Sequence, residues 1–340
     1  MTGHPTGDQA SAVGPAWWLP GAHLQTVWAR LARPQHMIRF SREVLTTPDD
    51  DDLILDYTDG PPGSPRVLLL HGLEGSAHSL HTQGLAVLVA RAGWRAIAIN
   101  FRSCARDPLD IKRGLPNRRP RLYHSGETTD LDVVVRTLVA REPDAPLYAI
   151  GFSLGGNVLL KWLGEAGGAS AVRAAATLSV PYDLAAASRY LERRIGRVYT
   201  NHFMRRLKAK AADVITRFPR ETAHIDAARV RAAQTFFDFD DALTAPLHGF
   251  AGAAAYYAAS SAVGFLPRIA VPTYCLNAVD DPFFPPDAVT RAAAVAATNP
   301  QLRFEVTTWG GHTGFVSGRW PWRPRYWAEE ATLAWLAKHG

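Results

Sequence analysis

Cysteine is scarce in this 340-residue chain, which contains only Cys104 and Cys275. Two cysteines cannot form a disulfide framework, so we expect both to be reduced, small apolar residues of a cytoplasmic protein. No cysteine pair stands at zinc-ligand spacing and no H-E-x-x-H motif occurs. The glycine-rich stretch 151–156 lacks both the G-x-G-x-x-G pattern and a Walker lysine. We therefore expect neither a metal nor a cofactor.

Long apolar runs and blocks of like charge are also missing. A membrane-spanning helix needs about 18 or more apolar residues in succession, and no such run occurs. Residues 1–14 lack the basic start and apolar core of a signal peptide, and we expect them to form a loose tail. The net charge of +6 comes from basic residues spread along the chain, which argues against a nucleic-acid partner.

Apolar strand patterns instead alternate with helical patterns from residue 67 onward. Strands are expected at Val67–His71, Arg95–Asn100, Leu147–Phe152, Ala174–Val180, Thr273–Asn277 and Arg303–Thr307. Helices are expected at Ser79–Ala92, Thr128–Arg141, Val158–Glu165, Pro286–Ala297 and Arg325–Lys338. This alternation predicts the α/β class, with a mostly parallel sheet flanked by helices.

The segment 181–266 contains only helical patterns, at 184–195, 198–211, 227–235 and 249–261. Because it follows the fourth parallel strand and precedes the next, we expect it to form a helical cap over the strand ends. The core then consists of residues 15–180 and 267–340. The cap aromatic residues expected to line an apolar pocket are Phe203, Phe236, Phe237, Tyr256 and Tyr257.

The part before residue 67 predicts a packed helix at Trp17–Arg33 and then a β-hairpin. Its strands are expected at Met37–Thr47 and Leu53–Tyr57. The acidic turn Asp49–Asp52 between them lacks the spacing of an EF-hand loop. We expect this turn to be solvated.

A nucleophile elbow is predicted at Ser153. The apolar run 145–150 ends in Gly151-Phe152-Ser153-Leu154-Gly155, which fits G-x-S-x-G, and a helical pattern follows. Small residues two positions away on each side let the strand and helix approach each other. The serine hydroxyl then projects from the tip of the turn.

A serine hydroxyl needs a base and an acid to become a nucleophile. In this fold class the acid follows the serine along the chain, and a histidine, the base, follows the acid. His312, flanked by glycines after the last predicted strand, is the candidate base. Asp281 is the favoured acid, and the adjacent Asp280 remains an alternative. The oxyanion hole is expected to use the backbone amides of Leu73, in the loop after the first core strand, and of Leu154.

Further motifs match one known family. They are HLQT at 23–26, HGLEGS at 71–76, NFRSC at 100–104, SGETTD at 125–130, GFSLGGN at 151–157 and the segments 277–283 and 310–315. On these motifs the chain resembles the YheT-like subfamily of α/β-hydrolases. The resemblance implies that fold and assigns the charge relay to Ser153, Asp281 and His312. Ser103 departs from the glycine usual in the family's NFRGC motif. Arg102, Glu127 and Asp130 are expected to form a salt-bridge network that braces the loops.

Together these features predict a serine hydrolase that cleaves carboxylic esters of short to medium acyl chain through an acyl-enzyme intermediate. Acyl transfer to an alcohol is the nearest variant. A lipid hydrolase with weak peripheral membrane contact is a second interpretation, based on Trp17, Trp18 and Trp28 and the positive charge. A non-catalytic lipid- or protein-binding protein is a third. The expected partner is a small-molecule ester or lipid; the sequence does not indicate an oligomeric state.

Overall fold

The computed structural model describes residues 13–33, 38–193 and 196–339. The expected N-terminal tail therefore lies outside the described residues except for Val13 and Gly14. Both are on the approach to helix α1 (Ala22–Leu31), which begins later than the helix expected from Trp17.

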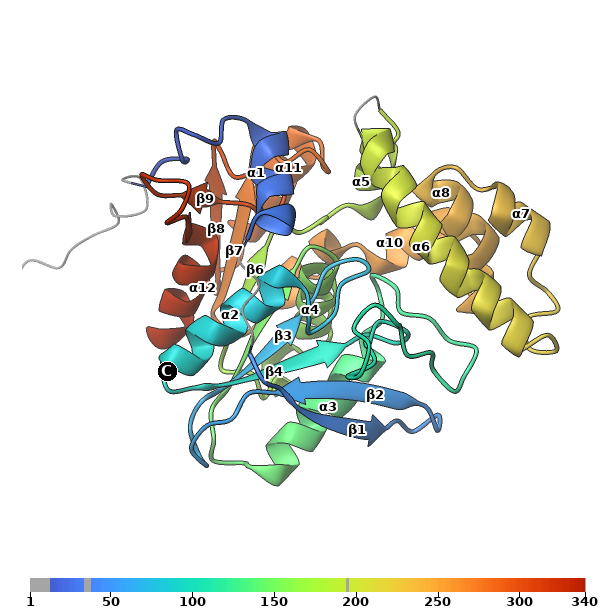
Figure 1. The fold of residues 1–340 in the computed structure, drawn as a ribbon, viewed down its shortest axis with the longest axis horizontal. Helices are drawn as coiled ribbons and strands as arrows, with labels where there is room; N and C mark the ends of the chain where they lie inside the picture. The colour runs from blue at the N-terminus through green and yellow to red at the C-terminus, as the bar shows by residue number, and fades with distance from the viewer. Residues whose placement is uncertain (1–12, 34–37, 194–195, 340) are drawn as a thin grey trace, which may run out of the picture.

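An eight-stranded sheet forms the centre of the molecule, in the order β1-β2-β4-β3-β5-β6-β7-β8 (Figure 1). The strands are β1 (Ser41–Thr46), β2 (Asp52–Tyr57), β3 (Arg66–Leu70), β4 (Arg95–Asn100), β5 (Leu147–Phe152), β6 (Ala174–Leu178), β7 (Thr273–Ala278) and β8 (Leu302–Thr307). Neighbours from β4 to β8 pair in parallel, whereas β1 and β2 form the predicted antiparallel hairpin at one edge. The prediction of a mostly parallel α/β sheet is confirmed. A short ribbon of β9 (Val316–Ser317) and β10 (Arg325–Tyr326) lies outside it.

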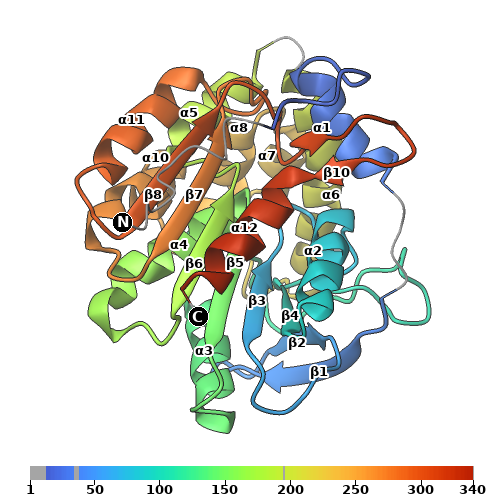
Figure 2. The ribbon, with the colours of Figure 1, turned by 90° about the vertical axis from the view of Figure 1, so that its left-hand side faces the viewer.

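Helices cover both faces of this sheet (Figure 2). One face packs against α2 (Leu80–Arg91) and α12 (Trp327–Ala337). The other packs against α3 (Thr129–Arg141), α4 (Leu154–Ala166) and α11 (Pro286–Ala296). The sequence of β3 is continuously apolar because both of its faces are buried. Val67 and Leu69 pack on the side of α2 and α12, and Leu68 and Leu70 pack on the side of α3, α4 and α11.

The described residues between β6 and β7 contain helices and no strand. The α-helices are α5 (Leu184–Leu191), α6 (Gly196–Arg217), α7 (Ala227–Ala232), α8 (Phe236–Phe239), α9 (Ala245–Leu247) and α10 (Ala253–Ser260). The shorter turns are the π-turn η3 (Asp240–Thr244) and the 3₁₀ turns η4 (Ala262–Gly264) and η5 (Leu266–Arg268). Another 3₁₀ turn, η2 (Gly167–Ala169), lies before β6. In Figure 1, helices α5 to α8 project to one side of the sheet.

Two details of this helical segment differ from the prediction. Helix α6 continues past the expected end at residue 211, because Val214 is buried in a separate small core beneath the cap helices. The helical run 236–247 was not predicted, since its aspartates and Pro246 disfavour a helix interior. A reciprocal capping box between Thr235 and Asp238 starts it, and the π-turn carries it on to Pro246.

The acidic turn of the hairpin is not simply solvated, contrary to the prediction. The Asp51 side chain is fully buried and accepts a 2.7 Å hydrogen bond from the Arg102 guanidinium. Arg102, itself 1% exposed, also donates to Asp49 and, through two nitrogens, to Asp130. Two buried carboxylates, of Asp51 and Asp130, and the partly exposed carboxylate of Asp49 share one guanidinium, which ties the hairpin to the loop after β4 and the start of α3. Arg121 and Glu127 extend the network.

The usual family glycine is replaced by Ser103 at a position with left-handed backbone, φ 61°. The Asn117 side chain accepts hydrogen bonds from the Ser103 amide and hydroxyl. These contacts stabilise a conformation that glycine would adopt without cost.

Within the described parts of the chain, no helix combines the length and hydropathy needed to cross a bilayer. In the same residues, no group of three or more histidine, cysteine or carboxylate side chains is arranged to hold a metal ion. Cys104 and Cys275 are both free and buried.

Candidate active site

Ser153 sits at the tip of a tight turn between β5 and α4. Its backbone angles, φ 49° and ψ −118°, are strained for a residue with a side chain. The two flanking positions, Gly151 and Gly155, have no room for a side chain. A Cβ on Gly151 would lie 2.6 Å from the Gly155 carbonyl oxygen, and one on Gly155 would lie 2.4 Å from that of Leu70. The predicted elbow geometry is therefore present at Ser153.

The imidazole of His312 bridges Ser153 and Asp281. Its Nδ1 lies 2.9 Å from Asp281 Oδ2, and its Nε2 lies 3.0 Å from Ser153 Oγ. A carboxylate only accepts hydrogen bonds, so Nδ1 carries the proton and Nε2 accepts from the serine hydroxyl. Burial raises the pKa of Asp281, and hydrogen bonds from His312 and the Phe283 amide act against this rise.

Asp280 takes a different position from its neighbour. Its Oδ1 accepts a 2.9 Å hydrogen bond from the Gly311 amide and therefore braces the loop that carries His312. Of the two acids considered, the structure brings Asp281 and not Asp280 to the imidazole.

Helix α1 holds the His312 loop in place, a role that the sequence did not reveal. The Thr26 hydroxyl accepts a 2.8 Å hydrogen bond from the His312 amide. A Cβ on Gly311, where φ is 58°, would lie 2.4 Å from the Ala22 carbonyl oxygen. Gln25 donates to the Val316 carbonyl and accepts from its amide. The HLQT motif marked this segment, but only the fold shows what the segment contacts.

Phe283 and Phe284 enclose the imidazole. The Phe283 ring stacks on His312 with centroids 3.9 Å apart and an interplanar angle of 8°, and Phe284 meets the same ring edge-on at 5.3 Å. Both phenylalanines come from the loop that starts at Asp281. The stack fixes the ring plane in which Nε2 points to Ser153 Oγ.

The loop after β3 lies directly against the nucleophile. A Cβ added to Gly72 would lie 3.3 Å from Ser153 Cβ, so the backbone of this loop passes close to the serine. Leu73 is the next residue of the loop. Leu154 is the first residue of α4, where backbone amides lack partners within the helix. The two predicted oxyanion donors therefore belong to segments that meet at Ser153.

His71 braces this loop as a neutral ring. Its Nε2 accepts from the Phe101 amide, so its Nδ1 is the donor to the Gly72 carbonyl, 2.7 Å away. Burial lowers the pKa of His71 to about 3, which keeps the ring uncharged.

Glu74 anchors the same loop to two other elements. Its amide donates to the Tyr123 hydroxyl at 2.7 Å, and its carboxylate accepts from Lys210 Nζ on α6 at 2.7 Å. One ion pair thereby links the loop after β3 to helix α6.

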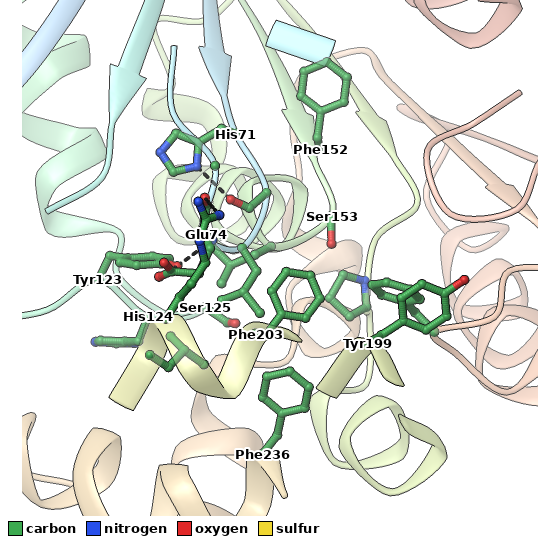
Figure 3. Close-up of a pocket in the computed structure, with 18 of the residues that line it drawn as sticks. His71, Glu74, Tyr123, His124, Ser125, Phe152, Ser153, Tyr199, Phe203 and Phe236 are labelled. Atoms are coloured by element: carbon green, nitrogen blue, oxygen red, sulfur yellow. Dashed lines mark hydrogen bonds between the residues drawn. The ribbon is translucent and has the colours of Figure 1, made fainter. Parts of the chain in front are cut away.

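A cavity of about 900 Å³ lies beside Ser153, between the sheet edge and the cap helices (Figure 3). Phe203 and Phe236 stand on one side of it, and Tyr123 and His124 on another. Tyr256 and Tyr257 also line it, as predicted. Phe237 does not: its ring is 43% exposed, because α8 turns this side chain away from the cavity.

Comparisons with known proteins agree with this geometry. A family model described as the alpha/beta hydrolase fold matches residues 65–318. The chain is 36% identical to "Putative esterase YheT" of Escherichia coli (strain K12), over 93% of this chain and 90% of that protein. It is 30% identical to the mouse protein "Phospholipase ABHD3", over 87% of this chain and 74% of that protein. An esterase of Pyrococcus furiosus, Pf2001, superposes with a TM-score of 0.56 at 16% identity, over 88% of this chain and 93% of that one.

The family match covers most of the chain, and the similarity to YheT extends over nearly all of it. Together with the sheet and the elbow, these matches confirm the resemblance that the motifs indicated. The chain belongs to the YheT-like group of the α/β-hydrolase family and is a hydrolase.

Proposed function

We propose that this hydrolase is a serine carboxylesterase in which Ser153 is the nucleophile, His312 the base and Asp281 the orienting acid. The observation that carries the proposal is the continuous hydrogen-bonded chain from Asp281 through His312 to Ser153 Oγ.

The reaction follows from this geometry in two steps. Nε2 of His312 takes the proton of Ser153 as Oγ attacks the ester carbonyl, and the Leu73 and Leu154 amides stabilise the oxyanion. Asp281 holds the protonated imidazole, which then protonates the departing alcohol. Water, activated by the same histidine, releases the acid and restores Ser153.

The cavity supports an acyl chain of short to medium length as the group carried by Ser153. Aromatic rings from the cap, such as Phe203 and Phe236, and Phe284 from the sheet side give it an apolar wall. Residues 181–266 act in this proposal as the cap, over a core of 15–180 and 267–340. The substrate is a small-molecule ester or lipid. The buried free cysteines fit a cytoplasmic location.

A fluorophosphonate probe tests the assignment, since it labels only an activated serine. We expect labelling of the wild-type protein and of Ser188→Ala, which removes another hydroxyl that lines the cavity. Ser153→Ala and His312→Ala should not be labelled. Absence of labelling in the folded wild-type protein would refute the proposal, and a series of p-nitrophenyl esters would then measure chain-length preference in the labelled proteins.

A further inference from the structure

Three exposed tryptophans gather at one end of the molecule. Trp17 and Trp322 are 71% and 72% exposed, and Trp320 is 41% exposed. Trp320 and Trp322, in the loop between β9 and β10, stack with ring centroids 5.2 Å apart. Trp17, distant in sequence, joins them through a 3.0 Å hydrogen bond from its indole nitrogen to the Arg319 carbonyl.

This tryptophan surface also carries cations without counter-charges. Arg319 lies with its guanidinium carbon 5.1 Å from the Trp320 ring centroid, and Arg323 is exposed in the same loop. Within the described chain neither arginine forms an ion pair, although the nearby Arg325 pairs with Glu330. Exposed tryptophan beside unpaired arginine is the chemistry of the bilayer interface, where an indole sits among headgroups and a cation meets anionic lipid.

The tryptophan surface continues to the mouth of the cavity through α1. Trp18 donates to the Gly318 carbonyl and packs against Trp28 of α1, with centroids 4.8 Å apart. Val27, the residue directly before Trp28 in α1, is 37% exposed and lines the cavity. Val198 of α6, another lining residue, is 68% exposed. The β9–β10 loop and α1 lie at the same upper end of the molecule (Figure 1).

We propose that the surface formed by Trp17, Trp320, Trp322, Arg319 and Arg323 docks on an anionic lipid bilayer and turns the cavity mouth toward it. The contact is interfacial and reversible, because it uses a few side chains and no spanning helix. The docking proposal rests on the proposed esterase function and adds to it that a lipid surface is the source of the ester. An ester that leaves the bilayer would then reach Ser153 with little exposure to water.

Co-sedimentation with vesicles tests the docking without requiring catalysis. We expect the wild-type protein to bind vesicles of equal parts phosphatidylcholine and phosphatidylglycerol, and to bind phosphatidylcholine alone more weakly. Trp320→Ala with Trp322→Ala should lower binding to both vesicles by about tenfold. Arg319→Gln with Arg323→Gln should lower binding by about tenfold on the anionic vesicles only, and added salt should mimic this loss.

A matched control has the same change of charge at the opposite end of the sheet. Arg91 ends α2 and Arg173 precedes β6, both exposed, and Arg91→Gln with Arg173→Gln should bind like the wild-type protein. Equal binding by this control and the Arg319/Arg323 variant overturns the proposal, as does a wild-type protein that stays in the supernatant. So does gel filtration that shows a dimer lost in the Trp320/Trp322 variant, because a second copy then covers the surface.

Failure of the docking and failure of the esterase proposal give different results. If only the docking is wrong, vesicle binding is absent while Ser153 is still labelled by fluorophosphonate. If only the esterase is wrong, vesicle binding persists without labelling. Both variant pairs should hydrolyse a water-soluble p-nitrophenyl ester at the wild-type rate, because none of these side chains lines the cavity.

Discussion

The two sides of the cavity are built by different means. On the sheet side, directional hydrogen bonds hold each proposed catalytic group, such as the Thr26 hydroxyl on the His312 amide. On the cap side, aromatic rings such as Phe203 and Phe236 pack among other apolar side chains, while polar contacts such as that of Lys210 with Glu74 attach the cap to the rest of the fold. Bond making needs fixed angles and distances. Acyl binding needs only area and volume, so the cap can change while the chemistry is kept.

The largest effect is expected from the pair of adjacent acids on the sheet side. Asp281→Asn should lower kcat by about 10³–10⁴, because an amide no longer holds the imidazole in the required tautomer. Asp280→Asn should cost about tenfold or less, since it loosens one loop contact to the Gly311 amide. Steady-state kinetics on one p-nitrophenyl ester compares them. A larger loss in Asp280→Asn would reverse the assignment.

The next largest effect is expected in the free energy of unfolding, which should respond differently to the loss of an arginine from the sheet side and from the cap. Arg102→Met leaves Asp49, Asp51 and Asp130 without their shared cation and should lower the free energy of unfolding by about 3–5 kcal/mol. In the cap, Arg229 pairs with Asp241 at an exposed site. Arg229→Met should therefore change stability by about 0.5 kcal/mol or less. Urea unfolding measures both, and similar losses would mean that the buried network is no more important than a surface pair.

The contact between α1 and the His312 loop should affect rate more than binding. Thr26→Val removes the acceptor of the His312 amide at nearly constant volume and should lower kcat by about 10–10²-fold with little change in KM. Thr26→Ser keeps the hydroxyl and should restore most of the rate. A Thr26→Ser variant as slow as Thr26→Val would show that the methyl group, and not the hydrogen bond, matters.

The smallest effect concerns one polar group of the cap. Burial raises the pKa of Asp240 to about 6, although Thr244 and Tyr257 donate hydrogen bonds to it. The unfolded chain has an aspartate pKa of about 3.9, so the folded state binds this proton more tightly. Its contribution to stability is therefore complete below pH ~3.9 and is lost as the pH rises through about 6.

Asp240→Asn should remove this dependence. The variant is expected to exceed the wild-type protein by about 1–3 kcal/mol at pH ~8, with the difference closing near pH ~4. Urea unfolding at the two pH values measures the gap. Asp241→Asn is the neighbouring control: the Ala253 amide and Arg229 lower the pKa of Asp241, so its loss should not stabilise the protein at high pH. A gap independent of pH would exclude titration of Asp240 as its cause.

The core could be predicted because its signals are local. The runs of β3 and β5 are apolar on both faces, and Gly151 is required by contacts with Gly155 and Gly156 of its own strand–turn–helix unit. Contacts between distant segments left weaker signals. Thr26 meets the His312 loop across 286 residues, and the buried Asp51 pairs with Arg102 across 51 residues. The Phe237 side chain points away from the cavity because of where helix α8 begins, and that start is set by a capping box that was not predicted from the sequence.

Ser153 has one further consequence, for folding rather than for chemistry. Its backbone, at φ 49° and ψ −118°, costs about 1–3 kcal/mol that the rest of the fold must offset. Glycine adopts this conformation freely, so Ser153→Gly should melt at a higher temperature than Ser153→Ala, although neither variant should hydrolyse esters. Differential scanning calorimetry compares the two, and equal melting points would mean that the turn is relaxed. Glycine at position 153 would therefore raise thermal stability, but the proposed reaction requires a hydroxyl there and excludes that replacement.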